Sequence, residues 1–259
     1  MLDVLFPMRC AGCGRGPWPF CSSCRDEIVV LSEPGCVRCG MPAEEELTGC
    51  RHCPPAPLRS ARAPFLYHGP VRAALFRLKW GGWRSVADAL GRSMGAVGDL
   101  QADLVSWVPL SSARRAARGY DQARALARAV SRATGLPLAP LVARVVDTAP
   151  QTARGGPERR RAMRGAFHAL GRAPPARVLL VDDVLTTGAT AAECARVMLD
   201  AGARHVGLLT AARATSWPLP ARCYTRAGSR PSLWLPGDPS PEVDASRRPS
   251  DPRKGTVGS

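Results

Sequence analysis

Two adjacent carboxylates and a group of small hydroxyl residues follow a short apolar run in residues 178–190, VLLVDDVLTTGAT. The carboxylates are Asp182 and Asp183. The loop after them reads Thr186, Thr187, Gly188, Ala189 and Thr190. Threonine hydroxyls and the free N–H groups at a helix start bind anions, and a glycine lets the backbone approach a phosphate without a Cβ in the way. The stretch therefore predicts an anion-binding loop.

Asp182 and Asp183 cannot bind a phosphate themselves, because like charges repel. Ribose hydroxyls suit them, and so does a hydrated Mg²⁺ that neutralises a pyrophosphate. A ligand with a phosphate, a diol and a second, metal-bound phosphate group meets all of these demands, and 5-phosphoribosyl-1-pyrophosphate (PRPP) is such a ligand. The alternative is a strand that ends in two solvated aspartates before a capped helix.

The neighbouring sequence supplies elements that could position this loop. Residues 178–182 are predicted to be a buried strand, 189–201 a helix ended by Gly202, and 205–212 another strand. Strand, helix and strand at this spacing predict a right-handed crossover and a parallel sheet. Ligands of such sheets bind beyond the carboxyl ends of the strands, where the loop would lie.

Earlier in the chain the pattern predicts a strand that ends near Val108, a helix with Leu126 and Val130 on one face, and helices interrupted at Gly81 and Gly82. Lys79 lies in an otherwise apolar stretch, where its side chain could reach a ligand or extend out to solvent, and we expect the latter.

Eight of the ten cysteines form four C-x-x-C pairs in the first 53 residues. Tetrahedral Zn²⁺ takes four thiolates, and a C-x-x-C turn places two sulfurs on one metal. We expect two structural zinc ions, one bound by Cys10, Cys13, Cys21 and Cys24 and one by Cys36, Cys39, Cys50 and Cys53. A cross-braced pairing is the alternative, because only seven residues separate Cys13 from Cys21. A redox or disulfide role is a rival explanation.

The positive charge lies in the middle of the chain. Residues 61–210 hold 22 Lys and Arg against 10 Asp and Glu, a net charge of +12, whereas residues 1–60 have a net charge of −1. Such a field attracts polyanions, either a polyphosphorylated metabolite or a nucleic acid. An arginine-rich, merely solubilising surface is the alternative.

Three units are predicted: a double zinc-ribbon module at 1–60, an α/β domain at 61–213, and a disordered tail at 214–259 rich in Pro, Ser, Gly and Arg. No stretch of eighteen apolar residues exists, and the start resembles no signal peptide. We therefore expect a cytoplasmic protein without membrane insertion.

The sequence resembles the ComF-type proteins, competence-linked homologues of the phosphoribosyltransferases, over roughly residues 2–213. The motifs in the shared order are LDVLFPMRCAGCG at 2–14, the cysteine pairs, FRLKW at 76–80, VPLSSARRAARGYDQA at 108–123, APQTARGGPERRRAMRGAF at 149–167, and the 178–190 stretch. That last stretch is similar to the PRPP signature of the type I phosphoribosyltransferases. Asp121 and Ala162 depart from the family pattern, which commonly has Asn at both positions, and an acid at 121 puts an anion contact there in doubt.

The resemblance implies a type I phosphoribosyltransferase fold, a parallel sheet flanked by helices, with the small zinc module in front. It implies that the loop at 109–115, with Ser111 and Arg114, binds pyrophosphate, together with Arg118 one helical turn after Arg114. It also implies that residues 144–164 form a mobile loop that closes over the active site and brings Gln151 and Arg159 to the departing pyrophosphate. Solvated surface arginines and a merely flexible basic loop are the alternatives.

The expected function is Mg²⁺-dependent transfer of phosphoribose from PRPP to an unidentified acceptor, with Asp182, Asp183 and Arg159 as the catalytic residues. The alternative is handling of single-stranded DNA in competence and DNA uptake, together with helicase-type competence partners. A third possibility is a sensor that binds PRPP without turnover. Analogy with the family also suggests a homodimer.

Overall fold

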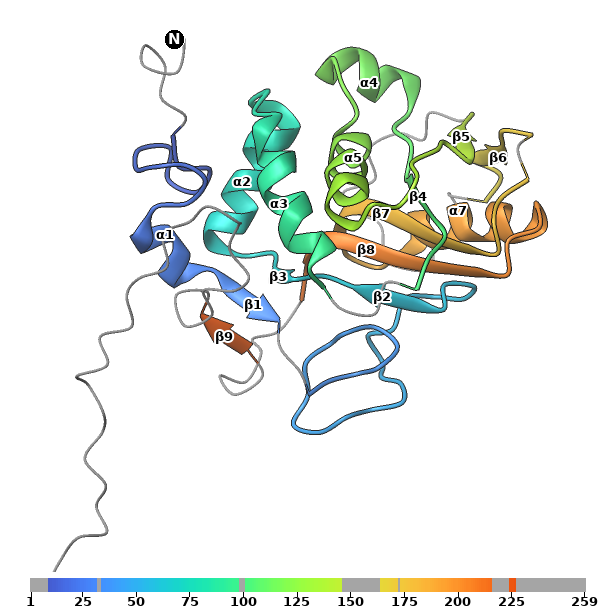
Figure 1. Cartoon of the computed structure of the whole chain (residues 1–259), viewed down its shortest axis with the longest axis horizontal. Helices are drawn as coiled ribbons and strands as arrows, with labels where there is room; N and C mark the ends of the chain where they lie inside the picture. Colours follow the sequence, from blue (N-terminus) through green and yellow to red (C-terminus); the bar gives the residue numbers. More distant parts are fainter. Residues whose placement is uncertain are drawn as a thin grey trace, which may run out of the picture.

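The structure is a computed structural model that describes residues 9–31, 34–97, 101–145, 164–171, 173–215 and 224–226. Its centre is a seven-stranded sheet in the order β4-β7-β8-β3-β1-β9, in which β2 also pairs with β8 (Figure 1). The parallel strands are β4 (Leu104–Trp107), β7 (Arg177–Leu185), β8 (His205–Arg213), β2 (Ser60–Arg62) and β3 (Phe65–Leu66). Two antiparallel strands complete one edge, β1 (Val29–Leu31) and β9 (Tyr224–Arg226).

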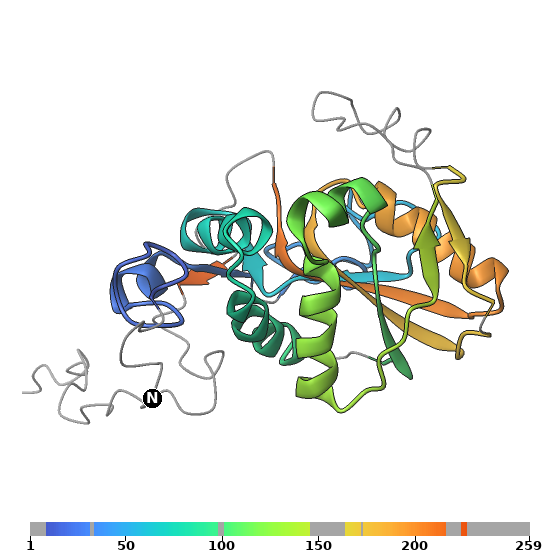
Figure 2. The same ribbon diagram turned by 90° about the horizontal axis from the view of Figure 1, so that it is seen from above.

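Helices cover both faces of this sheet. One face carries α2 (Gly69–Trp80), α3 (Ser85–Gly95) and α5 (Gln122–Thr134), and the other carries α7 (Ala189–Asp200). The short helix α4 (Ser112–Arg118) leads into α5, and a separate antiparallel pair, β5 (Val142–Arg144) and β6 (Phe167–Ala169), packs beside α7. The first ribbon, residues 10–24, holds the first four cysteines. Figure 2 shows it with α1 (Ser22–Glu27) at one end of the molecule, beyond α2 and α3.

The central strand β7 is buried on both faces, as a parallel strand covered by helices must be. Leu179 and Val181 pack in the core under α2, α3 and α5, whereas Val178 and Leu180 pack in the core with α7. The period of two along the strand fixes its register, because a slip by one residue would exchange the two sets.

The fold class expected from the sequence is confirmed for the described residues, a parallel sheet flanked by helices with a small N-terminal cysteine module. The interruption at Gly81 and Gly82 separates α2 from α3, and the crossover from β7 through α7 to β8 is present. Leu126 and Val130 are both buried on α5. No described helix has the length and apolar character of a membrane span.

The module at residues 9–31 shares its core with the sheet. Cys10, Cys24 and Ile28 pack with residues of α2, and β1 pairs with β3 at Val30 and Phe65. Arg77 of α2 donates hydrogen bonds to the carbonyls of Ala11, at 2.7 Å, and of Gly12. The division at residue 60 and the disordered tail stay predictions. Most of the tail lies outside the described residues.

Candidate functional site

The turn between β7 and α7 has the backbone that the sequence predicts for an anion-binding loop. Gly188 precedes the first residue of α7 and has a φ of 72°, in the left-handed region that favours glycine. A Cβ at this position would also lie 3.0 Å from Cβ of Pro54 and 3.3 Å from Cδ of Pro55. The first turn of α7 therefore begins at a tight bend, and its N–H groups lack carbonyl partners within the helix.

A cleft of about 230 Å³ opens at this turn and brings together most of the predicted site. From β7 and α7 it is lined by Asp182, Asp183, Thr186, Thr187, Gly188, Ala189 and Thr190, and from α4 by Arg114 and Arg118. Ser111 is not among the lining residues. It is buried, and its Oγ accepts a hydrogen bond from the N–H of Arg114 at 3.4 Å, which caps α4. Gln151 and Arg159 lie outside the described residues.

Asp183 is held by two side chains from the opposite wall. The Nζ of Lys79 lies 2.9 Å from Oδ2 of Asp183, and the Nε2 of Gln122 donates to the same oxygen at 3.0 Å. The expectation that Lys79 extends out to solvent was therefore wrong, because its ammonium group pairs with a carboxylate that is only 8% exposed. One oxygen of Asp183 is thus fixed, and Oδ1 points to no partner among the described residues.

Asp182 has a different environment from its neighbour. Burial and the adjacent charge of Asp183 raise the pKa of Asp182 to about 8, although its Oδ1 accepts a hydrogen bond from the N–H of Asp183 at 2.8 Å. Without a ligand, the Asp182 carboxyl group therefore carries its proton at neutral pH.

Asp121 supports the facing wall of the cleft. Its Oδ2 accepts the N–H of Leu110 at 3.2 Å, and its Oδ1 accepts the N–H of Arg124 at 3.1 Å, which caps α5. Burial raises the pKa of Asp121. This acid therefore ties the 109–111 loop to α5, a role that the comparison with the family pattern did not predict.

Cations predominate around the rest of the cleft. The guanidinium of Arg118 lies 4.2 Å from the ring centre of Trp80, and its Nε is buried without a hydrogen-bond partner among the described residues. Burial lowers the pKa of Arg118. Arg144 at the end of β5 also lines the cleft. Sequence reasoning missed Arg144 and Gln122 as site residues, although Gln122 lies inside a family motif, and it favoured the wrong one of two positions for Lys79.

The eight N-terminal cysteines form two groups of four, in sequential order. Cys10, Cys13, Cys21 and Cys24 make one group and Cys36, Cys39, Cys50 and Cys53 the other, with the sulfurs of each group within 4.8 Å of one another. Zn–S bonds of about 2.3 Å in a tetrahedron place sulfurs about 3.8 Å apart. The Sγ atoms of Cys13 and Cys21 are 3.8 Å apart, and those of Cys39 and Cys50 are 3.5 Å apart. Both groups thus fit a structural zinc ion. The N–H groups of Gly16 and Arg15 lower the pKa of the Cys13 thiol to about 6, which favours the thiolate that zinc binds.

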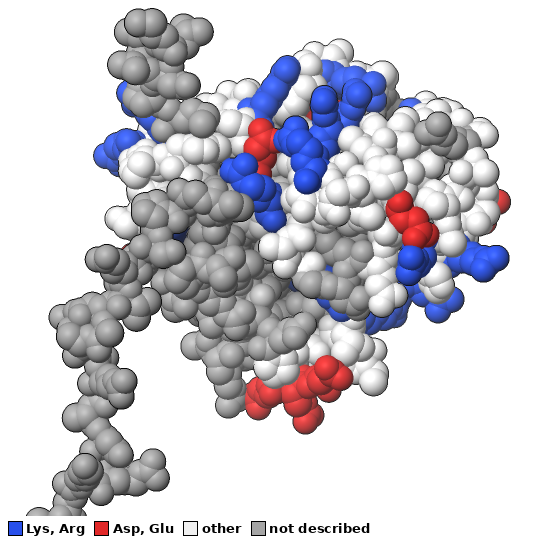
Figure 3. Space-filling view, in the orientation of Figure 1, with Lys and Arg blue, Asp and Glu red and all other residues white. Residues whose placement is uncertain are grey.

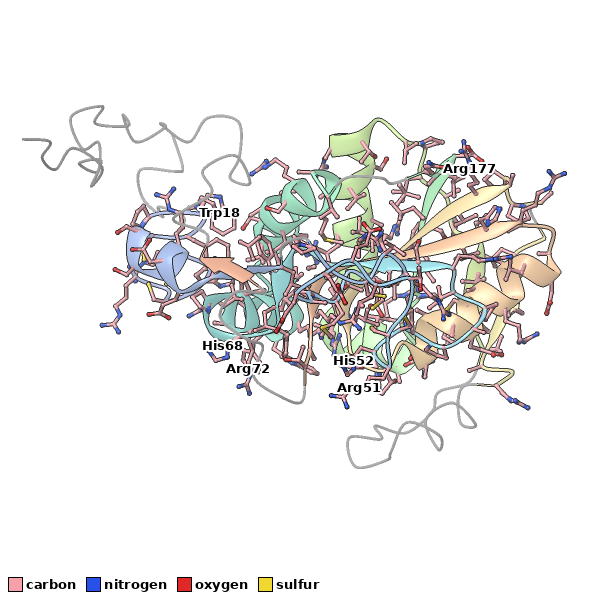
Figure 4. All side chains as sticks on the ribbon, turned by 90° about the horizontal axis from the view of Figure 1, so that it is seen from below. Trp18, Arg51, His52, His68, Arg72 and Arg177 are labelled. Carbon is pink, nitrogen blue, oxygen red and sulfur yellow. The ribbon has the colours of Figure 1, made fainter. Side chains whose placement is uncertain are left out.

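The second ribbon, residues 36–53, contacts the candidate site directly. The buried Arg213 at the end of β8 donates to the carbonyl of Cys39 at 2.8 Å and to that of His52. Pro54, the next residue after the ribbon, packs beside Gly188. Figure 4 shows Arg51 and His52 on the same side of the molecule as Arg72 of α2 and His68 just before that helix, with Arg177 on the opposite side. The second ribbon therefore borders the turn between β7 and α7.

Comparison with known proteins agrees with these features. A family model described as a double zinc ribbon domain matches residues 1–54. The DNA utilization protein YhgH of Escherichia coli K12 is 29% identical over 202 residues, which covers 74% of this chain and 88% of the relative. Competence protein F of Haemophilus influenzae is 29% identical over 81% of this chain and 98% of its own length. The resemblance to the ComF-type proteins is confirmed. Competence protein ComFC of Bacillus subtilis is 27% identical over 70% of this chain and 78% of its own length.

Solved structures with some likeness to the chain are more distant. The glutamine PRPP amidotransferase of B. subtilis, in complex with ADP and GMP, is 23% identical over 48% of this chain, with a TM-score of 0.36. An allosteric regulatory enzyme of purine biosynthesis is 22% identical over 49% of this chain, with a TM-score of 0.34. The chain spans 26% of the length of each. These likenesses concern the fold alone.

Proposed function

We propose that this ComF-type protein binds PRPP in the cleft and transfers its phosphoribosyl group to a nitrogen acceptor. One observation carries the proposal: the tight turn at Gly188 and two carboxylates lie at the carboxyl end of the same strand, and cationic side chains face them across the cleft. A phosphate suits the turn, a diol suits the carboxylates, and a pyrophosphate suits the cations.

In this proposal the 5-phosphate binds to the amides and hydroxyls of residues 186–190. The free Oδ1 of Asp183 accepts a hydrogen bond from a ribose hydroxyl, while Lys79 and Gln122 keep the carboxylate in place through Oδ2. Pyrophosphate lies toward Arg114 and Arg118, and Mg²⁺ bound to the donor oxygens neutralises part of its charge. Ser111 supports this wall by capping α4, and a direct contact from its hydroxyl stays a prediction.

The transfer breaks the bond between ribose C1 and the pyrophosphate oxygen, and the acceptor nitrogen forms the new bond to C1. The departing pyrophosphate keeps the electron pair of the broken bond, and the acceptor loses its proton to solvent. The guanidiniums of Arg114 and Arg118 stabilise the charge that develops on the leaving group. Arg159 would add to this stabilisation of the leaving group when its loop closes over the bound donor.

Calorimetry with two ligands tests the donor site. Asp183→Ala is expected to weaken PRPP binding in Mg²⁺ at least tenfold, because hydrogen bonds to charged groups contribute about 1.5–3 kcal/mol. Inorganic pyrophosphate has no diol, so its affinity is expected to stay or to rise when a negative charge leaves the cleft. Asp200→Ala removes an exposed carboxylate at the far end of α7 and serves as the control. Unchanged PRPP affinity in Asp183→Ala would contradict the proposal.

Release of pyrophosphate on addition of ammonia or free nucleobases separates a transferase from a sensor that only binds PRPP.

A second candidate function is the handling of single-stranded DNA. It is favoured by the net charge of +12 in residues 61–210 and by the names of the relatives, which refer to DNA utilization and competence. The two functions are compatible, because the donor cleft occupies only a part of the basic domain. Competence partners of the helicase type and a homodimer stay predictions.

A further inference from the structure

A second hollow, of about 410 Å³, lies where α3 begins and where α4 turns into α5. We call it the arginine groove, because four arginines line it: Arg84, Arg115, Arg124 and Arg128. All four are exposed to solvent. Its lining is separate from that of the donor cleft, with Arg114 and Arg118 of α4 facing the cleft and Arg115 facing the groove.

The arginines of the groove have no carboxylate partners within the described part of the chain. Some arginines elsewhere on the surface are paired, for example Arg132 with Asp88 and Arg177 with Asp103. The one carboxylate in the lining is Asp121, which is buried and accepts two backbone N–H groups. The lining of the groove therefore has an excess of positive charge.

Two aromatic rings hold the guanidiniums in place. The guanidinium of Arg84 lies 4.9 Å from the ring centre of Tyr120, and that of Arg124 lies 5.5 Å from Trp107. Arg124 and Arg128 are four residues apart on α5, a spacing at which like charges repel. A bound anion would relieve this repulsion, so the arrangement favours a polyanionic ligand.

The pairing of guanidiniums with aromatic rings continues from the groove toward α2. The charges of Arg84 and Arg118 both act on the Tyr120 hydroxyl, and Arg118 in turn covers Trp80. Trp80 is 60% exposed, and Phe76, one turn earlier on α2, is 63% exposed. In Figure 3, Lys and Arg gather over α3, α4 and α5, whereas a large group of acidic side chains lies on the loop of the second ribbon. A track of cations and aromatic rings thus runs from the groove to the edge of the donor cleft.

We propose that the arginine groove and the aromatic face of α2 form a binding site for single-stranded nucleic acid. The guanidiniums contact successive phosphates, and Phe76 and Trp80 stack on unpaired bases. Stacking requires bases that are not paired in a duplex, so the site selects single strands. The proposal gives the second candidate function a surface, and it is independent of PRPP binding.

Fluorescence anisotropy with a labelled oligothymidylate of about 20 nucleotides tests the groove, since such a strand exceeds the usual site size of one domain. Arg124→Gln/Arg128→Gln is expected to bind at least tenfold more weakly than wild type. Its plot of log affinity against log salt should be less steep by about 1.4, because each lost phosphate contact removes about 0.7. Arg59→Gln/Arg204→Gln removes the same charge from two exposed arginines outside the groove and should retain affinity within about twofold.

Phe76→Ala/Trp80→Ala tests the stacking face, and both side chains are exposed enough for the fold to tolerate the change. This variant is expected to lose at least tenfold in affinity while it keeps the wild-type salt dependence, since stacking contributes about 1–3 kcal/mol per base. Equal losses in the groove and control variants, equal affinity for a duplex of the same length, or absent binding by the wild type would overturn the proposal. PRPP calorimetry on Arg124→Gln/Arg128→Gln should give unchanged affinity, because neither residue lines the donor cleft, so a failed donor site and a failed strand site are distinguished.

Discussion

Asp182 and Asp183 are neighbours in sequence but have different chemical states in the fold. One oxygen of Asp183 contacts both the ammonium group of Lys79 and the side-chain amide of Gln122, whereas the neighbouring Asp182 has a carboxyl group whose pKa is raised to about 8. Two carboxylates this close cannot both ionise without cost, and Lys79 contacts only one of them. In the ligand-free cleft, Asp182 therefore favours its neutral form near neutral pH.

This difference predicts an effect of pH on stability. The folded pKa of Asp182 lies above the ordinary value of 3.8, so the folded state binds the proton more tightly than the unfolded state. The contribution of Asp182 to the free energy of unfolding therefore falls as pH rises between about 4 and about 8. Asp182→Asn cannot ionise, so its melting temperature should exceed that of wild type by more at pH 8 than at pH 6.

Thermal melts without ligand at several pH values measure this difference. The exposed Asp200 serves as the control, and Asp200→Asn should differ from wild type by an amount that does not grow with pH. A melting difference between Asp182→Asn and wild type that stays constant from pH 6 to pH 8 would contradict the raised pKa.

Gly188 is the second residue on which the site depends. An alanine there would adopt a left-handed backbone at a cost of about 1–2 kcal/mol and would place its Cβ 3.0 Å from Pro54. Gly188→Ala is therefore expected to weaken PRPP binding at least tenfold and to lower the melting temperature by several degrees. Gly171→Ala provides a control, because this glycine is also left-handed, with a φ of 70°, but no atom lies near its missing Cβ. Equal PRPP affinity in both variants would contradict the role of the turn.

At the scale of elements, the turn between β7 and α7 lies beside the second ribbon. Arg213 joins the end of β8 to the carbonyls of Cys39 and His52, and Pro54 packs on Gly188. The first ribbon packs instead against α2 and has no such contact in the described part of the chain. The two zinc sites therefore have different consequences for the cleft.

Removal of one zinc ligand at a time tests this difference. Cys50→Ser in the second ribbon and Cys13→Ser in the first should each lower the zinc content by about one equivalent. Only Cys50→Ser is expected to weaken PRPP binding, because only the second ribbon borders Gly188. Zinc analysis and calorimetry provide the two readouts. Equal PRPP affinity in the two variants, with zinc lost from both, would show that the ribbon does not support the turn.

The elements that sequence reasoning predicted well have strong local signals. The apolar run before Asp182 predicted β7 close to its observed position. The glycines at the helix ends did the same for α7 and for the break between α2 and α3. The cysteine spacing predicted both groups of four. The position of Lys79 was not predictable in this way, because its partner is 104 positions later in the chain and no local pattern links the two. The contact of Pro54 with Gly188 is equally non-local.

At the scale of the whole molecule, the two charged regions have separate roles. The donor cleft combines cations with two acids, as a phosphorylated sugar requires, whereas the lining of the arginine groove has four arginines and the single carboxylate of Asp121. The loop of the second ribbon carries the exposed acids Glu44, Glu45 and Glu46, which disfavour a nucleic-acid backbone at that end. In this proposal the chain presents a small-molecule site and a polyanion surface on one domain.

The central claim concerns where PRPP binds, and a crystal structure of the protein with PRPP and Mg²⁺ tests it most directly. The account predicts that the 5-phosphate lies within hydrogen-bond distance of the amides of residues 188–190, with a ribose hydroxyl at Oδ1 of Asp183 and pyrophosphate toward Arg114. Electron density for PRPP at any other place, or a cleft that stays empty at saturating PRPP, would contradict it.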